Sequence, residues 1–256
     1  MLLIKTNTTG KIQFVLIAIL FFSFISDSFK DEQLKYPRVR QAYIDKESDM
    51  LSLLQDNHLD RRKLQIYLRA FKSEKQIELW GKNNSGDKYI LIKTYRICNT
   101  SGRLGPKRKS GDLQIPEGFY HINKFNPYSN FYLSLGINYP NRSDRILGVK
   151  GNLGGDIFIH GNCVTIGCLP ITDDKIKELY IFCVEAKNNG QNKIPVTIFP
   201  AKLTDSEFEK LSEEHSSDSD RIELWSALKK GYDIFNNTQK LPTIGVLSSG
   251  RYKVEN

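Results

Sequence analysis

A histidine and two cysteines lie within ten residues of one another in the segment IHGNCVTIGC, Ile159 to Cys168. A cysteine nucleophile needs its thiolate, and a free thiol titrates near about 8.5. A neighbouring imidazole can take the thiol proton and leave a reactive pair. The loop between His160 and Cys168 is long enough to fold back and permit such contact. The segment therefore predicts a cysteine–histidine pair for nucleophilic catalysis.

Two glycines frame this pair. Gly161 follows His160 and is expected to let the backbone turn where a Cβ would obstruct it. Gly167 precedes Cys168, and the main-chain N–H groups of these two residues are expected to hold a developing oxyanion, a contribution of roughly 3 kcal/mol per donor. No acidic residue adjoins His160. Its orienting partner is therefore left open between a backbone carbonyl and a distant side chain.

Two other interpretations use the same residues. A metal site would take His160, Cys163 and Cys168 as ligands, with Cys98 as a fourth, but this spacing fits no usual zinc pattern. A purely structural interpretation has a buried histidine and a disulfide, either Cys163–Cys168 or Cys98–Cys163. Cys183 lies on the apolar stripe of a predicted helix and is expected to fill the core. We expect neither a metal nor a cofactor.

The predicted elements around the motif are mainly strands. The strand pattern at 156–159 brings His160 to its end, and a helix over 173–187 follows the motif with Thr172 as its N-cap. The tail pattern over 221–235 predicts a further helix, as does the lead pattern over 40–55. Alternation and turn residues predict the remaining strands, which are 63–71, 75–80, 88–98, 118–123, 131–137, 196–199 and 243–247.

These patterns predict a mainly β, α+β fold with four segments. Residues 1–28 are expected to be a signal peptide or N-terminal anchor, because Lys5 and Lys11 precede the apolar run Phe14–Phe22, which is too short to cross a bilayer. Residues 29–61 form a helical lead segment and 62–200 the catalytic domain. Residues 201–256 form a helical extension that packs on the core.

The net charge of the chain limits the classes of partner that it is expected to bind. The 256 residues carry a net charge of +8, which could hold an exported protein near an anionic surface. Nucleic acid is not expected as a partner, because no nucleic-acid-binding motif is present. The densest basic run, GPKRKSGD at Gly105 to Asp112, lies among glycine and proline. We expect it to form a solvated loop.

The motif also resembles a known family. IHGNCVTIGC is similar to the HG…(S/T)xGC signature of L,D-transpeptidases of the YkuD type. The segments LKYPRVRQAY, KTYRICNTSGRLGPKRKSGDLQIPEGFYHI and NPYSNFYLSLGINYPNRSDR resemble the YafK-like branch of that family. Together they cover most of Leu34 to Val184. Three features depart from the family pattern. Ile166 replaces a second histidine, and Leu169 and Pro170 follow the cysteine where many members place an arginine two residues after it. The gap between His160 and Cys168 is also shorter than in the main family.

The resemblance implies a fold, a reaction and a place of action. It implies a β-sandwich or barrel core with flanking helices, Cys168 as the nucleophile, His160 as proton acceptor and donor, and Gly167 as an oxyanion donor. The substrate would be a peptidoglycan stem peptide attacked at its diamino acid. Transfer of the acyl group to an amine is L,D-transpeptidation.

The resemblance leaves two alternatives open. Transfer of the acyl group to water would make the protein an amidase that releases lipoproteins or other proteins from peptidoglycan. An inactive peptidoglycan-binding module is the non-enzymatic alternative. In each case the expected location is the periplasm or cell envelope of a bacterium, and the expected state is a monomer.

Overall fold

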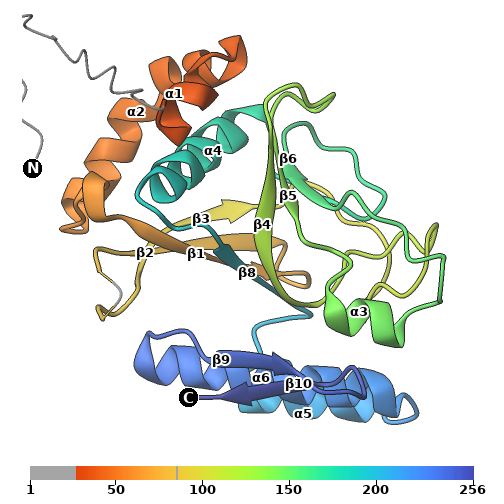
Figure 1. The fold of residues 1–256 in the computed structure, drawn as a ribbon. Helices are drawn as coiled ribbons and strands as arrows, with labels where there is room; N and C mark the ends of the chain where they lie inside the picture. Colours follow the sequence, from red (N-terminus) through yellow and green to blue (C-terminus); the bar gives the residue numbers. More distant parts are fainter. Residues whose placement is uncertain (1–26, 85) are drawn as a thin grey trace, which may run out of the picture.

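The computed structural model describes residues 27–84 and 86–256, and Figure 1 shows their arrangement. The predicted signal segment, residues 1–28, lies outside the described residues except for its last two. Within the described ranges, no helix is both long enough and apolar enough to cross a membrane.

One curled sheet forms the centre of the described chain (Figure 1). Its eight strands lie in the order β3-β2-β1-β8-β4-β5-β6-β7. At the edge of the sheet that carries the segment IHGNCVTIGC, β6 pairs antiparallel with β5 and parallel with β7. The α+β prediction with a β core and flanking helices is confirmed. The strands are β1 (Gln65–Phe71), β2 (Gln76–Lys82), β3 (Ile90–Arg96), β4 (Gly118–Asn126), β5 (Ser134–Ile137), β6 (Phe158–His160), β7 (Leu169–Pro170) and β8 (Ile194–Phe199).

Helix α4 (Asp173–Asn188) covers one face of this sheet, and α1 (Phe29–Leu34) and α2 (Pro37–Asp56) pack against α4 (Figure 1). The helical period predicted one apolar stripe on α4, and all its members are 0% exposed. Cys183 is among them, so its predicted role as core filler is confirmed. The stripe consists of Ile176, Leu179, Tyr180, Cys183 and Val184.

The start of α4 differs from the prediction. Thr172 occupies the N-cap position, but its φ is +76° and its side chain makes no capping hydrogen bond. The predicted N-cap residue is therefore confirmed, but its hydroxyl does not cap the helix. The Thr172 carbonyl instead accepts a hydrogen bond from Ile176 N at 3.0 Å. Asp173 and Asp174 in the first turn place negative charge at the positive end of the helix dipole.

The C-terminal residues lie below the sheet in Figure 1. They form α5 (Asp205–Glu214), α6 (Ser219–Thr238) and a hairpin of β9 (Thr243–Val246) and β10 (Tyr252–Glu255). Trp225 and Leu228 of α6 are both 0% exposed and belong to one cluster with Phe71 and Phe199 of the sheet. The apolar stripe predicted over 221–235 thus packs on the sheet.

Several elements, most of them short, were not predicted individually. A helix of six residues has fewer than two turns, so it carries too little apolar periodicity to be recognised. Local capping boxes instead hold both such helices, with Ser28 and Asp31 at α1 and Asn141 and Asp144 at α3. The unpredicted elements are α1, α3 (Arg142–Leu147), α5, β7, β10 and the 3₁₀ turn Arg61–Lys63.

Candidate active site

His160 lies at the end of β6 and is almost fully buried. The residue is 1% exposed, and its ring stacks on Phe131 with 4.5 Å between ring centroids. Nδ1 lies 2.5 Å from the carbonyl oxygen of Gly161. A carbonyl oxygen only accepts, so Nδ1 carries the proton and Nε2 of the neutral ring remains free to accept one. The orienting partner that the sequence left open is thus a backbone carbonyl.

The environment of His160 favours its neutral form. Burial lowers the pKa of the ring, while the Gly161 carbonyl and the Asp173 carboxylate act in the opposite direction; the net shift is downward. A neutral imidazole is the form that accepts a proton.

Gly161 is required by close contacts. A Cβ at this position would lie 2.6 Å from the carbonyl oxygen of Phe131 and still nearer to Asp173 Oδ1. The same Asp173 oxygen accepts a hydrogen bond from Asn162 N at 2.7 Å. The glycine therefore lets the loop after His160 pass directly over the start of α4.

Cys168 lies immediately before β7, the strand that pairs with β6 and its terminal residue His160. In the parallel register, Ile159 is opposite Leu169 and His160 is opposite Pro170. Cys168 therefore lies beside Phe158, two residues before His160. Extending this register by one residue, with side chains alternating along a strand, predicts that Cys168 and His160 lie on the same face of the sheet. Within the described chain no hydrogen bond joins ring and thiol; the Cys168 Sγ donates to the Asp156 carbonyl at 3.6 Å.

The thiol of Cys168 is half-buried and protonated more firmly than a free thiol. Burial raises its pKa, the N–H of Phe158 and the charge of Lys107 lower it, and the Asp156 carboxylate raises it; the net shift is upward. A proton acceptor is thus needed to generate the thiolate at neutral pH.

The side chain of Thr165 binds the two main-chain N–H groups that are expected to hold the oxyanion. Its Oγ1 accepts hydrogen bonds from the N–H groups of Gly167 at 3.2 Å and Cys168 at 2.8 Å, and donates to the Cys168 carbonyl at 2.8 Å. Sequence reasoning missed this residue. The signal was a threonine two residues before a glycine, because Ser and Thr hydroxyls commonly bond to backbone groups two or three residues away.

Gly167 is also needed for its backbone. Its φ is +133°, and a Cβ would come within 3.0 Å of the carbonyl oxygen of Gln114. Any side chain here would push the segment 105–117 away from the motif.

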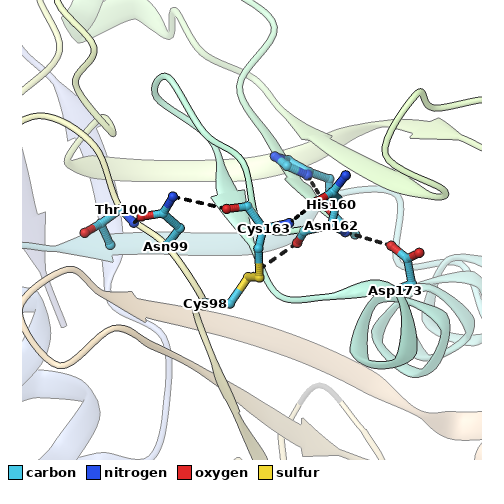
Figure 2. Close-up of a disulfide and its surroundings, with 8 residues drawn as sticks. Cys98, Asn99, Thr100, His160, Asn162, Cys163 and Asp173 are labelled. Carbon is cyan, nitrogen blue, oxygen red and sulfur yellow. Dashed lines mark hydrogen bonds between the residues drawn. A yellow bond between two sulfur atoms is a disulfide. The ribbon is translucent and has the colours of Figure 1, made fainter.

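A disulfide joins Cys98, just after β3, to Cys163 in the loop between His160 and Cys168 (Figure 2). Of the two predicted pairings, Cys98–Cys163 is the one present, and Cys168 is free. Asn99 Nδ2 also donates to the Cys163 carbonyl at 3.1 Å. The metal interpretation loses two of its four donors, because both sulfurs are bonded to each other.

The basic run departs from its prediction. Lys107 is only 5% exposed and pairs with Asp112, so the expectation of a solvated loop is wrong for this residue. Its carboxylate partner was already present in the same run. Lys109 is exposed, as predicted.

Comparison with known proteins gives the family. The model of the YkuD L,D-transpeptidase catalytic domain matches residues 65–198. The chain is 39% identical over 191 residues to "Putative L,D-transpeptidase YafK" of Escherichia coli strain K12, covering 74% of this chain and 73% of that protein.

Two solved structures are more distant. The helical cell shape determining protein Pgp2 of Campylobacter jejuni has a TM-score of 0.43 and 19% identity, over 72% of this chain and 73% of that one. L,D-transpeptidase 1 of Mycobacterium tuberculosis has a TM-score of 0.27 and 12% identity, over 53% and 62%. On the domain match and the identity to YafK, the chain belongs to the L,D-transpeptidase catalytic domain family.

Proposed function

We propose that this protein is a peptidoglycan-modifying cysteine acyltransferase with Cys168 as nucleophile and His160 as proton acceptor and donor. One observation carries the proposal: Nδ1 of His160 is held by the Gly161 carbonyl, and Cys168 directly precedes β7, the strand that pairs with the strand of His160. Family membership supports the substrate, a stem peptide attacked at the carbonyl of its diamino acid. This function places the protein outside the cytoplasm, in the bacterial cell envelope.

The reaction begins with transfer of the thiol proton of Cys168 to Nε2 of His160. The sulfur then forms a bond to the substrate carbonyl carbon, and the carbonyl electron pair moves to oxygen. When the tetrahedral intermediate collapses, the C–N bond breaks and the leaving amine takes the proton from the imidazolium. The product of this half-reaction is a thioester on Cys168.

The oxyanion is held by the N–H groups of Gly167 and Cys168. Because Thr165 Oγ1 accepts from both in the free protein, its side chain must move or share these donors when substrate binds. In the second half-reaction an acceptor amine attacks the thioester, and His160 removes its proton. The new amide leaves and the thiol is restored.

The proposal is tested with the purified protein, muropeptides and lipoprotein-linked sacculi, with products identified by mass spectrometry. New amide bonds between stem peptides support transpeptidation, whereas lipoprotein release with uptake of water identifies the amidase instead. Cys168→Ser is the control and should form neither product. No product from either substrate would reject the enzymatic function and favour a binding module.

A carbapenem gives a second, substrate-independent test. These compounds acylate reactive cysteines, so wild-type protein should gain one covalent adduct on the peptide that contains Cys168. Cys183 is fully buried and Cys98 and Cys163 are bonded to each other, so they should stay unlabelled. Equal labelling of Cys168→Ser would disprove the assignment of the nucleophile.

A further inference from the structure

A buried ion pair, Lys107–Asp112, lies in the loop whose end packs on Gly167, the residue before Cys168, and is not used by the reaction described above. Lys107 is 5% exposed; its Nζ is 2.5 Å from Asp112 Oδ1 and 3.0 Å from the carbonyl of Lys109. A buried ion pair is weak grounds for a stabilising role, because the desolvation cost can exceed the attraction. A role in the neighbouring site is the alternative.

Asp112 gives this basic loop, Gly105 to Gln114, a defined shape. Its Oδ2 accepts from the N–H groups of Arg108 and Lys109, both at 3.0 Å, and its Oδ1 accepts from Gln114 N at 3.1 Å. Burial raises the pKa of Asp112, but Lys107 and these backbone donors outweigh burial and the net shift is downward. Asp112 is therefore ionised at neutral pH and holds the ammonium in one place.

The basic loop contacts both segments that flank the thiol. The Gln114 carbonyl packs on Gly167, next to Cys168. On the other side, Ser110 N donates to the Asn152 carbonyl at 2.9 Å. That second segment continues to Asp156, whose carbonyl accepts from the Cys168 thiol. The loop is thus anchored on each side of the nucleophile.

We propose that Lys107 is a positioning residue for the nucleophile: held by Asp112, its fixed positive charge stabilises the thiolate of Cys168. The inference rests on the proposed function, because it takes Cys168 as the reacting group. The charged groups that act electrostatically on the thiol are Asp156 and Lys107. Of these, Lys107 carries the positive charge, which opposes the effect of burial on the pKa of the thiol.

The first test measures how fast iodoacetamide alkylates Cys168 from pH 6 to 10, with the modified peptide quantified by mass spectrometry. Lys107→Met should slow alkylation at neutral pH by roughly threefold to tenfold, because a smaller fraction of the thiol is ionised. Lys107→Arg should restore most of the rate. Lys109→Met is the matched control: it removes an exposed lysine of the same loop and should leave the rate unchanged.

The second test compares the direction in which two variants change the alkylation rate. Asp112→Asn removes the neutralising charge beside Lys107, so alkylation at neutral pH should become faster. If Asp112 and Lys107 only shape the loop, both variants should shift the rate in the same direction, and that result overturns the proposal. An unchanged rate in folded Lys107→Met also overturns it. If Lys107→Met does not fold, the sign in Asp112→Asn decides.

These measurements need no peptidoglycan, so they separate the two proposals. Opposite shifts in Lys107→Met and Asp112→Asn without any acyl transfer would reject the proposed function and leave the effect of Lys107 on the thiol intact. Acyl transfer with no effect of either variant on alkylation would support the proposed function and reject the role of Lys107.

Discussion

For His160, a catalytic role and a structural role predict different results when the residue is replaced. Its ring is buried against Phe131 and bonded to the Gly161 carbonyl, which would suit either role. Replacing His160 with Asn keeps polarity but removes the base, so carbapenem acylation should fall about 10²–10⁴-fold, the usual contribution of a positioned general base. Acylation rate and melting temperature should be measured on the same sample. Near-normal acylation with a lowered melting temperature would make His160 structural.

The two pKa shifts predict the pH profile of acylation. Acylation requires the neutral ring and the thiol proton that the ring accepts, and the apparent pKa values belong to the pair. The pKa of His160 is lowered, so the acid limb should lie below the ordinary imidazole value of about 6.5. The pKa of Cys168 is raised, so the alkaline limb should lie above the ordinary thiol value. A narrow bell centred between these ordinary values would contradict both shifts.

The loop between β6 and β7 is the element that joins the two proposed catalytic residues. The disulfide Cys98–Cys163 has a sequence separation of 65 and anchors this loop to the end of β3. The chain-entropy model assigns such a closure about 4 kcal/mol. The double variant Cys98→Ser/Cys163→Ser should therefore unfold at clearly lower temperature or urea concentration.

Acylation of Cys168 should nevertheless persist in the folded fraction of the double variant. Other contacts also hold the loop, namely Asn162 N to Asp173 Oδ1 at 2.7 Å and Ile171 N to the His160 carbonyl at 2.9 Å. Single-turnover acylation by a carbapenem, corrected for the folded fraction, measures this. Complete loss in folded protein would assign the disulfide a part in the chemistry.

At the scale of the whole molecule, the C-terminal segment reaches the same region as the basic loop. Trp225 Nε1 of α6 donates to Glu117 Oε2 at 2.7 Å. Glu117 Oε1 is 2.8 Å from Lys72 Nζ and also accepts from Gly105 N at 2.7 Å. The buried Lys72–Glu117 pair therefore connects the sheet, the start of the basic loop and α6.

Removing the indole donor should weaken this connection. Trp225→Phe leaves a buried carboxylate oxygen without its partner, at an expected cost of about 1–3 kcal/mol in the free energy of unfolding. Tyr232→Phe is the matched control on the same helix face, because no hydrogen bond of the Tyr232 hydroxyl is among the described contacts, and it should cost little. Urea denaturation measures both. Equal losses in the two variants would argue that Trp225 contributes only its apolar area.

The sequence by itself determined the features that depend on residues close to one another along the chain. Alternation predicted most of the strands, the helical period predicted α4 with Cys183 inside it, and HG…TxGC indicated the family and the candidate residues. Tertiary structure alone decided the disulfide pairing, because the end of β3 and the loop before β7 meet only when the sheet has formed. It likewise decided the burial of Lys107, since a charged run looks the same in sequence whether water or another loop covers it. The carbonyl that orients His160 and the hydroxyl of Thr165 were local in sequence, yet their contacts depend on backbone angles that the folded sheet imposes.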